Sequence, residues 1–318
     1  MTVRLPSPDI PLKIGTRGSP LALAQAHETR RRLGAAFDLP EAAFEICVIK
    51  VTGDDRSMIA ADRPLKEIGN KGLFTREIEE ALLDGSIDIA VHSMKDMPTV
   101  QPDGLILDTY LPREDVRDAF VSPTLRTLTD LAEGATVGTS SLRRRAQLLH
   151  KRPDLNVVEF RGNVQTRLQK LADGVADCTF LACAGLNRLG MADVPATPVD
   201  PTDMLPAVAQ GAIGIERRSD DSNTATLLEA IHHTATGHRL AAERQFLFTL
   251  DGSCETPIAA TSTIDGDTIT LHGEVLRPDG SDALSGMRTG PVADGPAMGT
   301  ALAQDLLKQA GPGFFDWH

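Results

Sequence analysis

Cationic side chains lie at four points where a predicted strand or loop passes into a predicted helix. These points read GTRGS at residues 15–19, NKG at 70–72, GTSSLRR at 138–144 and FRGN at 160–163. A helix start is the positive end of the helix dipole, so an arginine there is unfavourable unless an anion is bound. The pattern indicates a site for carboxylates or phosphates. It does not choose between them, or between an enzyme and a binding protein.

A base and an acid follow directly after another predicted strand, in the tetrad Ser93-Met94-Lys95-Asp96 before Pro98. An ammonium and a carboxylate at the carboxyl end of a strand can transfer protons or hold ligands of opposite charge. The same pair is also typical of a solvated surface, where Asp96 would pair with Lys95 or cap the next turn. Both interpretations stay open on these residues alone.

One of the four cysteines has a different setting from the others. Cys254 lies in the turn DGSCETP at residues 251–257, between a predicted helix and a predicted strand. Cys47, Cys178 and Cys183 lie in apolar runs, so we expect them to be buried. A thiol in a turn of small residues is more accessible and can be reactive. The spacing contains no CxxC pair, which indicates a reduced, cytoplasmic protein.

Charge and composition narrow the class of ligand. The chain of 318 residues has a formal net charge of −12, which repels nucleic acids, and 4% aromatic residues, too few for a base-stacking surface. Basic residues nevertheless gather between residues 141 and 167, opposed there by Asp154 and Glu159. They are Arg143, Arg144, Arg145, Lys151, Arg152, Arg161 and Arg167. An acidic chain with a local arginine cluster suggests a confined site for an anionic small molecule.

Two further kinds of site find little support. No GxGxxG or GxxxxGK[ST] fingerprint of nucleotide binding follows a strand. His232, His233 and His238 resemble a metal cluster only superficially, and we expect no metal. The longest apolar stretch, near residues 178–186, is too short to span a bilayer.

Short apolar strands alternate with amphipathic helices over the first two thirds of the chain, which predicts α/β architecture with parallel sheets. We expect strands at 12–17, 46–52, 87–94, 105–110, 119–122, 136–138, 157–160, 178–181 and 210–216, and helices at 20–33, 72–83, 142–149 and 164–171. Residues 54–70 show neither the alternation of a strand nor the apolar spacing of a helix, so we predict a long polar loop there. Ser19 and Pro20 suit the first turn of a helix.

The pattern of helices and β-rich runs in the last third of the chain predicts a separate small α+β domain. A helix is expected near residues 240–250, and two β-rich runs, 258–263 and 268–276, are separated by Asp-Gly-Asp at 265–267. That separation is a hairpin signal. A final helix is expected near 297–309.

Taken together, these motifs resemble the porphobilinogen deaminase family in order and spacing over roughly residues 12 to 260. The matching strings are GTRGSPLA at 15–22, KGLF at 71–74, VHSMKDMP at 91–98, PRED at 112–115, GTSSLRR at 138–144, RGNV at 161–164 with Thr166 and Arg167, AGL at 184–186 with Arg188, and QG at 210–211 leading to Ile215 and Glu216. Each string alone could arise by chance, but the ordered set is very specific.

The resemblance implies two periplasmic-binding-protein-like (type II) α/β lobes with a central cleft, plus a small C-terminal α+β domain. By analogy, domain 1 comprises residues 1–112 and 210–230, domain 2 residues 113–209, and domain 3 residues 231–318. The implied enzyme is a transferase that condenses four porphobilinogen molecules head to tail with loss of ammonia. It builds on one covalently bound dipyrromethane per chain, and water then releases hydroxymethylbilane.

The resemblance also assigns roles to the matched residues. Cys254 carries the cofactor through a thioether, although Ser253 stands where the family often has glycine. Asp96 is the catalytic carboxylate that stabilises the cationic azafulvene left by ammonia loss. The cofactor-binding positions are Lys95, Asp96, Thr139, Ser141, Arg143, Arg144 and Gly162. The substrate-binding positions are Arg17, Ser19, Lys71, Arg161, Arg167 and Arg188.

Some expectations complete this interpretation. Residues 54–70 match the family's candidate for a mobile cover, and Arg145 is expected to be solvated. We expect a cytoplasmic monomer without nucleic-acid or membrane partners. The main alternative is a non-enzymatic two-lobed binding protein for an anionic metabolite, which would have no use for Cys254 and would usually carry an export signal.

Overall fold

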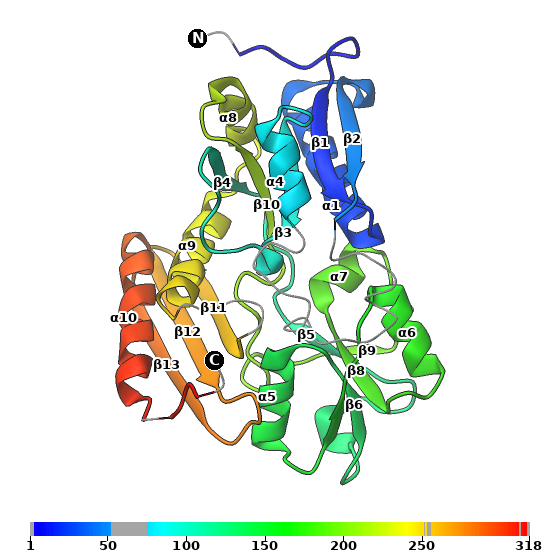
Figure 1. The fold of residues 1–318 in the computed structure, drawn as a ribbon, viewed down its shortest axis with the longest axis vertical. Coiled ribbons are helices and arrows are strands. Elements are labelled where there is room, and N and C mark those ends of the chain that lie inside the picture. The colour runs from blue at the N-terminus through cyan, green and yellow to red at the C-terminus, as the bar shows by residue number, and fades with distance from the viewer. Residues whose placement is uncertain (1–2, 52–74, 251, 253–255, 312, 317–318) are drawn as a thin grey trace. The chain divides into compact units, whose positions relative to one another are not determined.

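The computed structural model describes residues 3–51, 75–250, 252, 256–311 and 313–316 (Figure 1). These residues divide into two units. The first unit contains the described residues up to 114 and residues 212–237, and the second contains residues 115–211 and those from 238 onward. The predicted loop 54–70, Lys71 and Cys254 lie outside the described residues.

The first unit is built on a five-stranded sheet in the order β2-β1-β3-β10-β4. Its strands are β1 (Leu12–Arg17), β2 (Phe44–Ile49), β3 (Ile89–Ser93), β4 (Leu105–Tyr110) and β10 (Ile213–Arg218). β1 runs parallel to β2 and β3, but β10 is antiparallel to β3 and β4. The prediction of a wholly parallel sheet was therefore wrong. The chain reaches β10 from the second unit rather than through a crossover helix, so no βαβ connection imposes a parallel direction.

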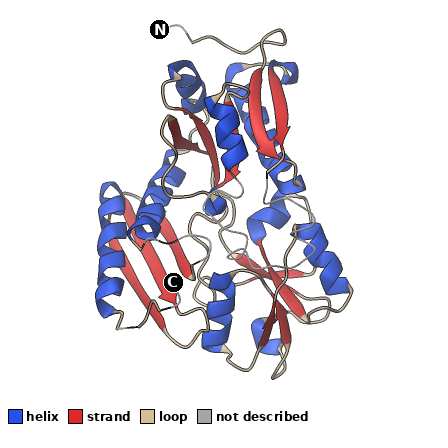
Figure 2. Ribbon diagram, viewed as in Figure 1, coloured by secondary structure: helices blue, strands red, loops and turns tan. Residues whose placement is uncertain are grey.

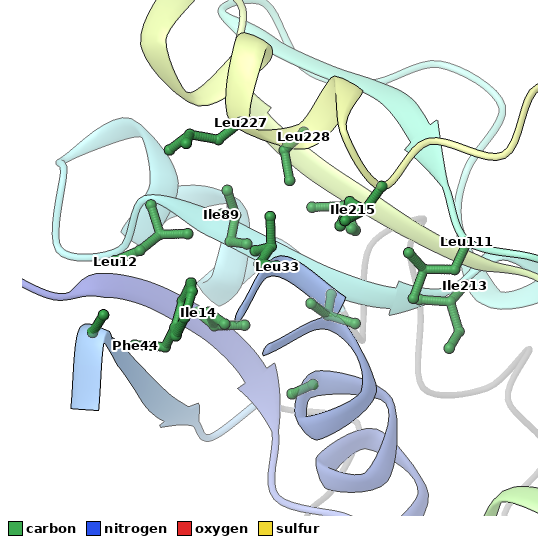
Figure 3. Packing of buried hydrophobic residues seen from close by; sticks show 14 residues of the cluster. Leu12, Ile14, Leu33, Phe44, Ile89, Leu111, Ile213, Ile215, Leu227 and Leu228 are labelled. Carbon is green, nitrogen blue, oxygen red and sulfur yellow. The ribbon is translucent and has the colours of Figure 1, made fainter. Parts of the chain in front are cut away.

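Alternation along β3 assigns helices to the two faces of this sheet. Ile89 and Val91 pack in one apolar cluster with residues of α1 (Pro20–Phe37) and α8 (Ser222–Glu229), as Figure 3 shows for Ile89. Ala90 packs with Ile78 and Leu82 of α4 (Arg76–Leu83) in another cluster. Successive strand residues face opposite sides of a sheet. The unit therefore has α1 and α8 on one face and α4 on the other.

The second unit contains a similar sheet in the order β7-β6-β8-β5-β9. Its strands are β5 (Asp118–Val121), β6 (Thr136–Gly138), β7 (Asn156–Val158), β8 (Cys178–Ala182) and β9 (Ala196–Pro198), and its helices are α5 (Leu142–Lys151), α6 (Val164–Ala172) and α7 (Cys183–Arg188). β6 is parallel to β7 and β8, whereas β5 is antiparallel to β8 and β9. Phe120 packs with Leu148 of α5, and Val121 packs with Leu171 of α6. This sheet is also mixed and covered on both faces.

The same unit carries the predicted C-terminal α+β segment (Figure 2). Strands β11 (Ile258–Asp265), β12 (Thr268–Leu276) and β13 (Ala283–Pro291) form an antiparallel sheet, accompanied by helices α9 (Thr234–Thr249) and α10 (Gly295–Gln309). Asp265 pairs with Thr268 across a two-residue turn, which confirms the predicted hairpin. The prediction missed β13 because its two glycines and terminal proline weaken the strand signal.

Helices α9 and α10 approach closely at Gly299, which generates a stability prediction. A Cβ added there would overlap the carbonyl oxygen of Ala242 and lie 2.9 Å from the backbone nitrogen of Phe246. Both atoms belong to the backbone of α9, so neither can move cheaply. We expect Gly299→Ala to lower the free energy of unfolding in urea by about 1–3 kcal/mol. The expectation is notable because alanine is otherwise the better helix former.

Gly311→Ala is the matched control, because nothing lies within 4 Å of a Cβ added at that position. Its unfolding free energy should stay within about 0.5 kcal/mol of the wild type. A Gly299→Ala protein as stable as the control would contradict this expectation, because it would show that α9 and α10 can move apart without loss of stability.

Candidate functional site

The first unit has a pocket at the carboxyl ends of β1 and β3. Because these strands are parallel and adjacent, the residues that follow them meet at one edge of the sheet. Residues after β1 and the short helix η3 (Met94–Asp96) after β3 contribute to the pocket wall. The side chains that line it include Arg17, Ser19, Gln25, Thr75, His92, Ser93, Asp96 and Met97. Three residues predicted from the sequence are therefore brought together: Arg17, Ser19 and Asp96.

The turn between β1 and α1 holds Arg17 and Ser19 in place. Ser19 is the N-cap of α1, and its hydroxyl accepts a hydrogen bond of 3.3 Å from the backbone N–H of Ala22. Thr16, fully buried, donates its hydroxyl to the carbonyl of Ala22 at 3.2 Å. The predicted helix start at Ser19 and Pro20 is confirmed. These bonds anchor the turn at the positive end of the helix dipole, where an anion is favoured.

Asp96 provides the opposite charge in the same pocket. Its side chain is exposed, and within the described part of the chain its carboxylate makes neither a hydrogen bond nor an ion pair. The surface interpretation, in which Asp96 pairs with Lys95 or caps the next turn, is not what these contacts show. Lys95 lies beside it in η3 and is half-buried. A carboxylate without a protein partner can face a cationic group of a ligand.

Gln25 is a pocket residue that the sequence analysis did not identify. It lies in the second turn of α1 and is 3% exposed. Its side-chain amide exchanges hydrogen bonds with Ser93, which accepts from Nε2 at 2.8 Å and donates to Oε1 at 3.1 Å. A polar residue on the buried face of a helix was the signal available in the sequence. The contact fixes the end of β3 against α1.

The second unit gathers its predicted residues at a comparable edge. β6 and β7 are parallel, so Thr139 and Ser141 lie beside Arg161 and Gly162 at the carboxyl ends of these strands. The Ser141 N–H donates to the Thr139 hydroxyl at 3.2 Å, and the Ser141 hydroxyl caps α5. Arg161 is 7% exposed. Cationic and neutral donors therefore occupy one edge, as predicted.

Gly162 has a conformation that other residues rarely adopt. Its φ is +120°, and an added Cβ would lie 2.7 Å from the Cβ of Thr166. The Gly162 carbonyl accepts a hydrogen bond of 2.9 Å from Nε of Arg167. Arg188, at the end of α7, donates to the carbonyl of Gly211 at 2.9 Å. Backbone carbonyls thus orient two of the predicted substrate-binding arginines.

Arg143 and Arg144 turn toward the interior rather than toward solvent, because both bind the carboxylate of Asp118. Arg143 Nη2 lies 2.7 Å from one oxygen of Asp118, and Arg144 Nη2 lies 2.6 Å from the other. Arg143 also donates to the Leu205 carbonyl and Arg144 to the Phe180 carbonyl, each at 2.7 Å. Arg145, in contrast, is half-buried, and its side chain has no hydrogen bond or ion pair within the described residues.

Asp118 is fully buried, yet it is ionised. Burial alone would raise its pKa, but the positive charges of Arg143 and Arg144 and hydrogen bonds from Arg144 and Gln210 hold the pKa well below its usual range. Gln210 donates to Asp118 at 3.0 Å and to the Val116 carbonyl at 2.8 Å. The sequence analysis missed Asp118. The available signal was a carboxylate at the start of the apolar strand DAFV, which requires a buried partner.

The cysteine predictions are confirmed for two residues. Cys178 and Cys183 are buried, and burial raises the pKa of Cys178 to about 12 and that of Cys183 to about 11. Cys47 is half-buried rather than buried, and burial also raises its pKa. All three are therefore poor nucleophiles at neutral pH. Among the described residues, no group of three or more His, Cys, Asp or Glu side chains could hold a metal ion.

Two family models match the chain. "Porphobilinogen deaminase, dipyromethane cofactor binding domain" matches residues 12–226, and "Porphobilinogen deaminase, C-terminal domain" matches residues 238–308. A relative named porphobilinogen deaminase from Paracoccus denitrificans is 63% identical over 314 residues, 99% of either chain. A chloroplastic porphobilinogen deaminase from Oryza sativa subsp. japonica is 53% identical over 310 residues, 96% of this chain and 86% of the relative.

Solved structures with a similar course of the chain include periplasmic binding proteins. The methionine-binding protein MetQ is 14% identical over 71% of this chain and 91% of its own, with a TM-score of 0.42. A periplasmic substrate-binding protein of an ABC transporter from Coxiella burnetii is 15% identical over 71% and 93%, with a TM-score of 0.40. The predicted fold class, two α/β lobes with a small C-terminal α+β segment, is confirmed by the two five-stranded sheets with their helices and by the separate three-stranded sheet. The predicted central cleft stays a prediction.

The buried arginine–carboxylate cluster generates a prediction about stability and pH. Asp118→Asn leaves two buried guanidinium groups without their counter-charge. We therefore expect the free energy of unfolding, measured in urea at pH 7, to be about 3–5 kcal/mol lower than that of the wild type. A carboxyl whose folded-state pKa is lowered stabilises the fold above its unfolded-state pKa, near 4. The difference in unfolding free energy between the wild type and Asp118→Asn should therefore be constant from pH 7 to about 5. It should shrink as the pH falls below about 4.

Arg145→Leu is the control, because this neighbour of the cluster has no described partner to lose. Its unfolding free energy should change by less than about 0.5 kcal/mol. Equal losses in both variants, or a difference between wild type and Asp118→Asn that grows on acidification, would contradict the assignment.

Proposed function

The chain belongs to the porphobilinogen deaminase family, and on this premise we propose which residues carry the reaction. Its function is the stepwise condensation of four porphobilinogen molecules, with loss of ammonia, on a dipyrromethane cofactor, followed by hydrolytic release of hydroxymethylbilane. We propose that it is a transferase of the hydroxymethylbilane synthase type. The alternative of a non-enzymatic binding protein is not favoured.

One observation carries the assignment of the reacting site: Arg17 and Asp96 line a single pocket. Every porphobilinogen carries an acetate and a propionate, which a guanidinium binds through paired hydrogen bonds. Loss of ammonia leaves a positive charge on the substrate, which no arginine can stabilise. The carboxylate of Asp96 supplies the negative charge that this step requires. We assign Asp96 as the catalytic residue and Arg17 and Ser19 as substrate-binding residues.

The remaining cationic positions are proposed to hold the acidic side chains of the growing product. Condensation adds two carboxylates per unit, so the product becomes a polyanion that needs several cationic partners. Arg161 and Arg188 follow strands β7 and β8 of the second unit, where ligands bind in α/β sheets. Substrate binding is proposed for Arg17, Ser19, Lys71, Arg161, Arg167 and Arg188.

The residues of the second unit fit an acidic pyrrole cofactor. Arg143 and Arg144 share the carboxylate of Asp118, and the charge of Glu274 on β12 also acts on Arg143. Nε of Arg143 is buried and has no hydrogen-bond partner among the described residues. An acetate or propionate group would supply an acceptor for such a donor. When bound, the dipyrromethane supplies the pyrrole to which the first substrate unit is joined. We propose that Lys95, Asp96, Thr139, Ser141, Arg143, Arg144 and Gly162 hold it.

We propose Cys254 as the residue that carries the cofactor through a thioether. Its position matches the family's anchoring cysteine, in a turn of small residues just before β11. The other three thiols support this choice because burial raises the pKa of each of them. A thiol must be accessible, and readily ionised, to form a covalent bond with a ligand.

We further propose the three-domain division given by the family, with domain 1 at residues 1–112 and 210–230, domain 2 at 113–209 and domain 3 at 231–318. Separate family matches at 12–226 and 238–308 support a boundary before the third domain. We also propose a cytoplasmic monomer, since Cys47, Cys178 and Cys183 are free thiols, as a reducing compartment favours. None of the described helices has the length and apolar character needed to cross a membrane.

The covalent link generates a prediction about mass. The intact wild-type chain, denatured and treated with thiol reductant, should be heavier than its sequence by one dipyrromethane, because a thioether resists reduction. Cys254→Ser should have the mass of its bare sequence, whereas Cys47→Ser should keep the adduct. Active wild-type protein of unmodified mass would overturn the proposal.

The role of Asp96 generates a prediction about turnover. Asp96→Asn removes the negative charge but keeps the size of the side chain. We expect turnover of porphobilinogen to fall by at least about a hundredfold, equivalent to about 2.7 kcal/mol of transition-state stabilisation. The melting temperature should stay near the wild-type value, because the carboxylate has no described partner to lose. Asp96→Glu, which keeps the charge, should retain part of the activity.

Asp103→Asn is the matched control, since Asp103 is an exposed carboxylate of the same unit that does not line the pocket. Its turnover should equal that of the wild type. Normal turnover by Asp96→Asn, or loss of activity only through unfolding, would move the catalytic assignment to another residue.

A further inference from the structure

The pocket around Asp96 is lined by His92, which forms a buried acid–base pair with Glu216 that the proposed mechanism does not use. His92 of β3 and Glu216 of β10 lie on neighbouring strands, and Nε2 of His92 is 3.1 Å from Oε2 of Glu216. The two side chains are 5% and 0% exposed. Ile213 and Ile215 of β10 belong to the cluster on the α1 face, so Glu216 lies on the α4 face.

The hydrogen bond to His92 matters for Glu216 because the carboxylate is fully buried. Its other oxygen, Oε1, is buried and has no hydrogen-bond partner within the described residues. Glu79 of α4 lies in the same surroundings. Burial raises the pKa of Glu79, and the charge of Glu216 raises it further.

The second ring nitrogen of His92 is available to a ligand. The carboxylate of Glu216 can only accept a hydrogen bond, so a neutral ring carries its proton on Nε2 and leaves the lone pair of Nδ1 free. His92 lines the pocket together with Arg17 and Asp96. Nε2 is the ring nitrogen bound to Glu216, and Nδ1 has no hydrogen-bond partner among the described residues. We infer that Nδ1 is the atom that His92 presents to the pocket.

We propose that His92 is the proton acceptor of the condensation and that Glu216 is the positioning residue that holds its tautomer. The inference rests on the proposed role of the Asp96 pocket. Among the described residues, the charged groups that line this pocket or act on the ring are Arg17, Asp96, Glu79 and Glu216. Three of the four are acidic, and Arg17 is reserved for substrate carboxylates.

The proton balance of each condensation explains why an acceptor is needed. The ammonium form of the substrate loses ammonia as its C–N bond breaks, and the nitrogen keeps the electron pair. The acceptor pyrrole, a substrate-derived unit in all cycles but the first, then forms a C–C bond to that methylene carbon. Its ring carbon loses a proton to Nδ1 of His92. Nδ1 passes this proton to the ammonia, which leaves as ammonium, so charge and atoms balance.

His92→Gln tests the proposal, because the glutamine amide can still donate a hydrogen bond to Glu216 but cannot accept a proton at neutral pH. We expect turnover to fall by about a hundredfold while the melting temperature and the mass of the bound cofactor stay unchanged. The acid limb of the pH dependence of kcat, which reports protonation of the imidazole, should disappear. His27→Gln, an exposed histidine on α1, should show none of these changes. A purely structural His92 would instead lower the melting temperature and leave the pH profile in place.

A measurement on the resting enzyme gives a readout independent of activity. In protein labelled with ¹⁵N-histidine, the nitrogen shifts of His92 should show a protonated Nε2 and an unprotonated Nδ1 at high pH. Glu216→Gln, whose amide can also donate, should mix the two tautomers and lower turnover by about tenfold or more. A tautomer with the proton on Nδ1 in the wild type would overturn the proposal, even if His92→Gln fails to fold.

The outcomes separate this inference from the proposed function. Full turnover by His92→Gln, together with an inactive Asp96→Asn, would reject His92 as the proton acceptor and leave the pocket assignment intact. Full turnover by both variants would reject the pocket itself.

Discussion

The second unit depends on one buried ionic contact, the carboxylate of Asp118 held between the guanidinium groups of Arg143 and Arg144. A charge removed from water must be matched by opposite charge and hydrogen bonds, or the fold loses several kcal/mol. The cluster meets this requirement by recruiting groups from separate segments: the Phe180 carbonyl of β8, the Leu205 carbonyl and the Gln210 amide. The beginning of α5, the strand β5 and the segment before β10 are therefore held in register by the same contact.

That constraint extends to the C-terminal sheet through Glu243 of α9. Its buried carboxylate accepts hydrogen bonds from the backbone N–H of Ala209 at 2.9 Å and from the N–H of Ser262, in β11, at 2.8 Å. Ala209 has a φ of +60°, an unusual value for alanine, and directly precedes Gln210. Two buried acids thus act on consecutive residues, and the strained backbone between them is held from both sides. In the sequence, Cys254 lies between α9 and β11, the two elements that Glu243 connects.

The first unit brings opposite charges together in one pocket instead of pairing them in its interior. Arg17 lies at the end of β1 and Asp96 in η3 just after β3, and these two strands are parallel neighbours. Under the proposed function, such a pocket accepts an acidic substrate and then stabilises a cation. Arginines of one chain therefore have two kinds of surroundings: Arg143 and Arg144 bind a buried carboxylate, whereas Arg17 lines a pocket. Burial and the nearest carboxylate decide between these roles, not the residue type.

The sequence by itself determined the α/β class, most strands and helices, the hairpin at 265–267, the cap at Ser19 and the family, because each depends on local spacing or on an ordered set of motifs. Its resemblance to the family also implied that Arg17, Ser19 and Asp96 belong to one active site, and the structure places all three in one pocket. The tertiary structure alone decided the antiparallel directions of β5 and β10, the burial of Arg143 and Arg144 on Asp118, and the pairing of His92 with Glu216. Those features join segments far apart in the sequence, 124 residues for the last pair, and no local period records which distant carboxylate meets which cation.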